Sequence, residues 1–193
     1  MKECRCVLLC GPSGIGKTTL IDNLVKIPNV VRLPAYTDRP VRSYERNGRE
    51  YFFVSPIEFA KLVTAGDISP EDIRRFGDYS FGFSHSLARR LIRTGKTLVV
   101  EAFCKEIAAW RAQYGEALLV VAMFPADKAI LRQRLIERGH SSEFIEMRLQ
   151  QAIREIGDLT NNSSVNLTLN INSDTTTDEL VDILLQSGLR RGA

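Results

Sequence analysis

Near its N-terminus the chain reads Gly11-Pro12-Ser13-Gly14-Ile15-Gly16-Lys17-Thr18, which fits the phosphate-binding pattern G-x-x-x-x-G-K-[ST] at every fixed position. Its surroundings fit as well: the apolar residues 6–10 predict a buried strand before it, and residues 19–25 predict the start of a helix after it. Glycines let backbone N–H groups turn inward as an anion nest, and the helix N-terminus adds partial positive charge. The stretch therefore predicts binding of a nucleoside triphosphate.

The residues of this loop have expected roles in holding the triphosphate. Lys17 can reach the β- and γ-phosphates, and the Thr18 hydroxyl can bind Mg²⁺. The candidate ATP-binding residues are Gly11, Ser13, Gly14, Ile15, Gly16, Lys17, Thr18 and Thr19. We therefore expect ATP as a co-substrate, with Mg²⁺ as its cofactor.

Length and composition predict an ordinary globular protein with anionic ligands. The chain has 193 residues, 44% of them hydrophobic and 25% charged, with a net charge of +3. This mild charge does not require nucleic acid as a partner. The longest apolar run, residues 117–124, is much shorter than the ~20 residues of a membrane span. We expect a cytoplasmic monomer or homodimer that binds small-molecule substrates, with no nucleic-acid or membrane partner.

The four cysteines, Cys4, Cys6, Cys10 and Cys104, are interpreted as buried, reduced thiols. Three of them lie at even spacing on the first predicted strand, so their side chains should share one face. A zinc site would need a second pair of ligands, and both histidines lie far away in the sequence.

Short apolar runs alternate with helical patterns along the chain, which predicts a parallel sheet between two helical layers. The predicted strands are residues 5–10, 29–33, 97–103, 117–124 and 166–171, and the predicted helices are 56–65, 84–94, 128–138, 142–156 and 178–187. Residues 35–83 are rich in Arg, Tyr, Pro and Gly and indicate an inserted lobe, whereas residues 128–154 are basic and helical. We expect a core (1–34, 95–126 and 155–193), an acceptor-binding lobe (35–94) and a lid (127–154).

A second motif follows the phosphate loop and carries a family resemblance. It runs from Thr37 to Val54 and contains Arg39, Arg42 and Tyr51. This segment resembles the T-T-R-x-x-R-x-G-E-x-x-G-x-x-Y-x-F-V signature of guanylate kinases. Further similarity continues at Glu58-Phe59, Gly66, Gly77, Gly82, Gly95-Lys96, residues 131–135, Arg138-Gly139, Arg148-Leu149 and the region of Asn172 and Asp174. The resemblance spans nearly the whole chain and implies a three-layer α/β/α fold of the P-loop NTPase type.

The resemblance implies that Arg39, Arg42 and Tyr51 grip the phosphate of an acceptor nucleotide. Two guanidinium groups can make bidentate contacts with a phosphate, and a phenol adds one more donor. The full set of candidate acceptor-binding residues is Thr37, Arg39, Arg42, Tyr51, Glu71, Tyr79 and Phe81.

The same resemblance implies a catalytic role for lid arginines. Arg134, Arg138 and Arg148 match the lid positions and, with Lys17, are the candidate catalytic residues. Such arginines stabilise the charge of a phosphoryl group in transfer. Glu101 follows the apolar residues 98–100, near the carboxyl end of a predicted strand, where it faces the ligand crevice of an α/β sheet and can join Thr18 in holding Mg²⁺.

The chain departs from the family pattern where the acceptor base would be read. Ala35 replaces a serine, Phe103 replaces an acidic residue, and residues 79–82 contain an insertion that can put Phe81 at the place of a tyrosine. The glutamate expected after Gly66 aligns with Pro70 or with Glu71. Losing polar base contacts should loosen or redirect specificity.

Three functions follow from these features. The first is an ATP-dependent kinase that phosphorylates the phosphate of a small acceptor, with GMP converted to GDP. The second is a ribose 1,5-bisphosphate phosphokinase, because residues 111–139 resemble those enzymes, which need no base pocket. The third is a non-catalytic module that binds phosphopeptides, a function that usually goes with a degraded phosphate loop.

Overall fold

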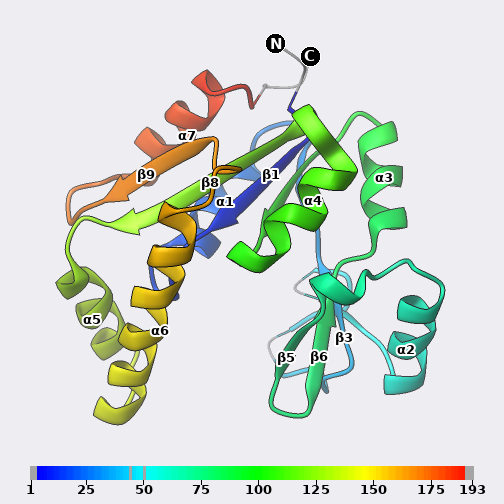
Figure 1. The fold of residues 1–193 in the computed structure, drawn as a ribbon, viewed down its shortest axis with the longest axis horizontal. Helices are drawn as coiled ribbons and strands as arrows, with labels where there is room; N and C mark the ends of the chain where they lie inside the picture. Colours follow the sequence, from blue (N-terminus) through cyan, green and yellow to red (C-terminus); the bar gives the residue numbers. More distant parts are fainter. Residues whose placement is uncertain (1–3, 44, 50, 190–193) are drawn as a thin grey trace.

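The computed structural model describes residues 4–43, 45–49 and 51–189. At its centre lies a parallel sheet with the strand order β2-β7-β1-β8-β9 (Figure 1). Its strands are β1 (Cys6–Cys10), β2 (Val30–Arg32), β7 (Thr97–Glu101), β8 (Leu118–Pro125) and β9 (Leu167–Ile171). These are the strands that the apolar runs predict, so the parallel sheet is confirmed.

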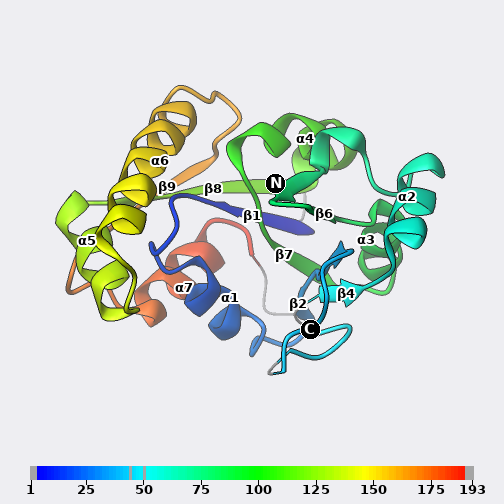
Figure 2. The ribbon, with the colours of Figure 1, turned by 90° about the horizontal axis from the view of Figure 1, so that it is seen from below.

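Helices cover both faces of this sheet. α1 (Lys17–Leu24) and α7 (Thr177–Gln186) lie on one face, and α3 (His85–Arg93) and α4 (Ile107–Tyr114) lie on the other (Figure 2). Neighbouring side chains of a strand point to opposite faces, so Leu9 packs with α1 and Leu8 packs with Trp110 of α4. The three-layer α/β/α fold is therefore confirmed.

The cysteines divide between the two faces of the sheet. All four are free, and Cys4, Cys6 and Cys10 are buried. Cys6 and Cys10 join the apolar cluster on the α4 side, whereas Cys4 joins the cluster on the α1 side. The prediction of one shared face is wrong for Cys4, because β1 begins only at Cys6 and the alternation does not extend back to residue 4.

A second, smaller sheet stands beside the core as a separate arm (Figure 1). Its strand order is β4-β3-β6-β5, and its elements are β3 (Ala35–Thr37), β4 (Tyr51–Phe53), α2 (Pro56–Thr64), the short 3₁₀ turn η1 (Pro70–Asp72), β5 (Arg74–Phe76) and β6 (Tyr79–Gly82). The start of α2 is the one its sequence predicts: the Ser55 hydroxyl accepts from the backbone of Glu58, and the Glu58 side chain accepts from the backbone of Ser55.

A helical pair forms the opposite arm (Figure 1). α5 (Lys128–Glu137) packs against α6 (Ser142–Thr160), and Arg132 and Glu146 form an ion pair between them. Two further 3₁₀ turns, η2 (Cys104–Glu106) and η3 (Gly115–Ala117), flank α4. Among the described helices, none is both long enough and apolar enough to cross a membrane.

The first glycine of the phosphate loop is required by backbone geometry. Gly11 has a φ of +144°, and a Cβ there would collide with the carbonyl oxygen of Met123 on β8. We expect Gly11→Ala to lower the free energy of unfolding by at least about 2 kcal/mol, because both the backbone and β8 must shift. Urea denaturation measures this change.

Gly157→Ala is the matched control. Gly157 lies inside α6, and a Cβ there meets nothing within 4 Å. Alanine should raise the free energy of unfolding there by about 0.5–1 kcal/mol, since it is the better helix former. Equal effects of the two substitutions would contradict the close approach at Gly11.

Candidate active site

Strand register places the phosphate loop at the carboxyl edge of the main sheet. Leu9 pairs with Glu101 of β7, and Cys10 pairs with Ala122 of β8, so the loop leaves β1 between the ends of two neighbours. Gly14 and Gly16 have φ values of +88° and +112°, which turn the chain sharply into α1. The loop and helix therefore form the anion nest that the sequence predicts.

Lys17 is folded back into this loop and is only 8% exposed. Its ammonium donates to the carbonyl oxygens of Gly11 and Pro12, the latter at 3.1 Å, and lies 3.5 Å from a carboxylate oxygen of Glu101. A buried ammonium requires such partners, because burial without them costs several kcal/mol. The structure thus brings Lys17 and Glu101 together, with Thr18 exposed beside them.

A cleft of about 780 Å³ opens from this loop towards the smaller sheet. Its walls come from the loop, β5, η2 and α6. The cleft is rich in cations: Lys17, Arg74, Arg75, Lys105, Arg138, Arg148 and Arg154 all line it. Its charge therefore suits an anionic ligand.

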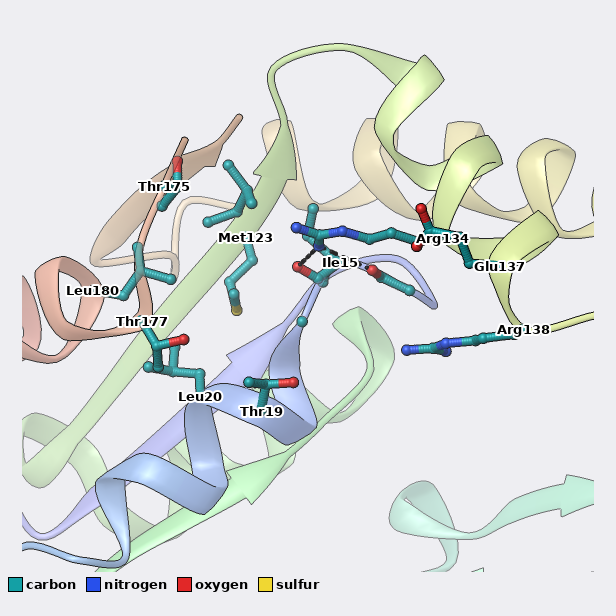
Figure 3. A pocket seen from close by; sticks show the side chains of 13 residues that line it. Ile15, Thr19, Leu20, Met123, Arg134, Glu137, Arg138, Thr175, Thr177 and Leu180 are labelled. Carbon is teal, nitrogen blue, oxygen red and sulfur yellow. Dashed lines mark hydrogen bonds between the residues drawn. The ribbon is translucent and has the colours of Figure 1, made fainter. Parts of the chain in front are cut away.

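A smaller pocket of about 270 Å³ lies on the other side of the loop. Arg134 reaches across the loop in Figure 3 and donates from Nη1 to the carbonyl oxygens of Ile15, at 2.7 Å, and Gly14, at 3.2 Å. Arg138 points towards the same loop and lines both the pocket and the cleft (Figure 3). Arg134 and Arg138 therefore lie at the loop.

Sequence reasoning missed the outer wall of this pocket. It is formed by Met123, Ile171, Thr175, Thr177 and Leu180. The sequence could have indicated this wall, because the polar residues 172–177 follow β9 at the carboxyl edge of the sheet, where α/β proteins bind ligands.

Arg148 of α6 lines the main cleft, opposite the smaller sheet. Its Nη1 donates to Gln151 at 3.1 Å, and its guanidinium lies 5.0 Å from the centre of the Phe144 ring. Its buried Nε has no hydrogen-bond partner in the described part of the chain. Arg148 therefore keeps donor capacity for an anion.

Arg39 and Tyr51 meet on the smaller sheet, outside the wall of the main cleft. Arg39 Nη2 donates to Glu45 at 2.7 Å, and its guanidinium lies 5.6 Å from the centre of the Tyr51 ring. The hydrogen bond from Arg39 lowers the pKa of the Glu45 carboxyl. The Arg42 backbone N–H donates to the same carboxylate at 2.8 Å, so Glu45 holds both arginines in one loop.

The remaining predicted acceptor residues are spread over the smaller sheet. Thr37 is buried and donates to the Ser80 carbonyl at 2.9 Å, while Phe81 packs its ring 5.5 Å from that of Tyr51. Tyr79 is 40% exposed. Glu71 is exposed and is bound by the Ser69 hydroxyl, so it is not brought to the cleft wall.

Glu155 of α6 is a cleft residue that sequence reasoning missed. It lies by the loop, where Lys17 and Glu101 act on it electrostatically. Burial raises the pKa of Glu155 to about 7, and its buried Oε1 lacks a partner among the described residues. A single acid on a charged helix carries no pattern that separates it from its exposed neighbours.

The parallel sheet, its helical layers and the loop after the central strand define a P-loop nucleotide-binding protein. A family model described as guanylate kinase matches residues 3–185. The chain belongs to the guanylate kinase family, a family of nucleoside monophosphate kinases.

Individual relatives agree with this assignment. The guanylate kinase of Porphyromonas gingivalis is 31% identical over 157 residues, covering 79% of this chain and 82% of that protein. The guanylate kinase of Rhodococcus jostii is 34% identical over 154 residues, covering 79% of this chain and 74% of that protein. The crystal structure of guanylate kinase from Anaplasma phagocytophilum shares the fold, with a TM-score of 0.69 at 19% identity, over 97% of this chain and 88% of that one.

The Glu155 carboxyl should make stability depend on pH. Its pKa is raised from 4.5 to about 7, so the folded protein retains this proton through a range where the unfolded chain releases it. The free energy of unfolding therefore falls progressively between pH 4.5 and pH 7, and the loss reaches its full value of up to about 3 kcal/mol above pH 7. Glu155→Gln should be more stable than the wild type at pH 8 and equal to it near pH 4.5.

Urea denaturation at the two pH values measures this difference, and Asp182→Asn is the control. Asp182 is an exposed carboxylate of α7, so its removal should change stability equally little at both pH values. A pH-independent effect of Glu155→Gln would contradict the raised pKa.

Proposed function

We propose that the chain transfers the γ-phosphoryl group of ATP to the phosphate of GMP, giving ADP and GDP. The observation that carries this proposal is the cleft that joins the phosphate loop to the smaller sheet, with cations along both walls. The names of the relatives support GMP as the acceptor.

On the donor side, the loop amides and Lys17 would hold the β- and γ-phosphates of ATP. Its nucleoside would extend into the 270 Å³ pocket on the far side of the loop. Arg134 is already fixed on the loop carbonyls, which preorganises its charge next to the phosphates. Arg138 and Arg148 would close on the transferring group from the lid.

The donor set also suits Mg²⁺. Thr18 and Glu101 offer a hydroxyl and a carboxylate oxygen at one edge of the cleft, and Mg²⁺ favours one or two such oxygens together with substrate phosphates. When bound, the ion would neutralise charge on the β- and γ-phosphates. Lys17 lies 3.5 Å from Glu101, so both groups face the same phosphates.

On the acceptor side, Arg39, Arg42 and Tyr51 would hold the phosphate of GMP. Transfer needs no general base, because a phosphate oxygen is already a competent nucleophile. We infer that residues 35–94 act as the acceptor lobe, 127–154 as the lid and the remainder as the core. The smaller sheet and the helical pair stand on opposite sides of the molecule in Figure 1, and both contribute residues to the cleft, so their approach would exclude water from the phosphates.

Lys17→Ala should abolish phosphoryl transfer and leave the fold intact. Without the ammonium, the developing charge on the phosphates is no longer balanced inside a buried site. We expect a loss of roughly 10²–10³-fold in kcat, measured by ADP release with MgATP and GMP. Lys26→Ala, an exposed lysine beyond α1, is the control. Normal turnover by Lys17→Ala would refute the proposed donor site.

Arg42→Ala should chiefly weaken use of the acceptor. We expect kcat/KM for GMP to fall roughly 10- to 100-fold, because a charge-assisted contact to phosphate is lost, while KM for ATP stays nearly constant. Arg93→Ala, an exposed arginine at the end of α3, should change neither value. The assay includes ribose 1,5-bisphosphate, and a preference for this sugar would overturn GMP as the acceptor.

A further inference from the structure

One arginine in the cleft wall formed by β5 and η2 is held by several contacts at once. Arg74 of β5 donates from Nε and Nη2 to the two carboxylate oxygens of Glu106, and from Nη2 to the carbonyl oxygen of Glu101 at 2.7 Å. Its guanidinium lies 4.6 Å from the centre of the Phe103 ring and 5.1 Å from that of Phe83. Nε, Nη2 and both faces of the guanidinium are therefore engaged, and Nη1 is not.

Glu106 is the buried half of this ion pair. It is 0% exposed, and its carboxylate also accepts from the backbone N–H of Phe103 at 2.9 Å. Glu106 itself does not line the cleft; the carboxylates that do are Glu101, which faces Lys17 at 3.5 Å, and Glu155 and Asp158 of α6. Among the described residues, the part of the cleft wall formed by β5 and η2 therefore offers a ligand no carboxylate.

The ion pair between Arg74 and Glu106 decides which edge of a guanine base this wall can bind. The N1–H and 2-amino groups of guanine form a pair of donors with the same spacing as two N–H groups of a guanidinium, and a carboxylate is their natural acceptor. Arg74 occupies both oxygens of Glu106, so these guanine donors find no such acceptor there.

Arg74 instead presents donors of its own. Its Nη1 makes no hydrogen bond to the described part of the chain, while the side chain lines the cleft and is 13% exposed. Phe76 is 50% exposed and lies beside Phe103, with ring centres 6.2 Å apart, so the same end of the cleft has an aromatic wall for a flat base. The N–H groups of Nη1 bind lone pairs, and on the outer edge of a 6-oxopurine these belong to O6 and N7.

We propose that Arg74, positioned by Glu106, reads the O6 and N7 edge of a 6-oxopurine nucleotide and leaves its 2-amino group unread. This inference rests on the proposed transfer to a nucleoside monophosphate and narrows its acceptor class. GMP and IMP, which share the 6-oxo group, are accepted alike. AMP is disfavoured, because its 6-amino group presents donors to a donor.

The test compares kcat/KM for GMP, IMP and AMP in the intact protein with MgATP. We expect GMP and IMP to agree within about fivefold and AMP to be lower by roughly 10- to 100-fold, as for the loss of one buried polar contact. A preference for GMP over IMP of about 100-fold would overturn the inference. No turnover with any nucleotide would instead refute the proposed function; equilibrium binding of GMP and IMP would then decide the inference, with equal affinities supporting it and a strong preference for GMP overturning it.

Variants separate base reading from a structural role. Arg74→Lys keeps the positive charge but loses the planar set of guanidinium N–H donors. It should lower kcat/KM for GMP and IMP together and so reduce their ratio to kcat/KM for AMP. Glu106→Gln removes the carboxylate that orients the Arg74 guanidinium. It should lower the ratio of kcat/KM for GMP to that for AMP as well, through KM more than kcat. Arg93→Ala is the control. An unchanged ratio of GMP to AMP in a folded Arg74→Lys protein would overturn the assignment.

Discussion

The contact between Gly11 and the Met123 carbonyl on β8 constrains the whole nucleotide end of the molecule. β1 is paired with β7 on one side and β8 on the other, and the chain must leave it without a side chain in the way. The parallel register then puts Glu101 beside the same exit. Loop, ammonium and carboxylate meet because of this register, which aligns residues that are far apart in the sequence.

The site also illustrates how charge is divided in a basic cleft. In and around the cleft, carboxylates do not simply cancel the cations: Glu101 faces Lys17, the buried Glu106 orients Arg74, and outside the cleft wall Glu45 holds Arg39. In each pair the acid fixes an otherwise flexible side chain in one geometry. Such preorganisation lowers the entropy lost when an anion binds, so the acids contribute to anion recognition despite their sign.

The sequence predicted the elements with strong periodicity or a motif: the strands of the parallel sheet, the phosphate loop and the helix α2. It did not predict the strands of the smaller sheet, which are only 3–4 residues long and lack a measurable alternation. α4 was missed because its apolar residues do not form one stripe. Arg74 and Glu155 gained their surroundings only from tertiary packing, which joins positions such as 74 and 106 without a local signal.

α6 has a mechanical consequence. It is one unbroken helix from Ser142 to Thr160, with the ion pair between Arg132 and Glu146 near its first turns and Glu155, which lines the cleft together with Gly11, near its last. A continuous helix moves as one rigid element, so a tilt at one end displaces the residues at the other end. A tilt of the outer arm would therefore displace Glu155 relative to the phosphate loop, because both ends belong to one helix.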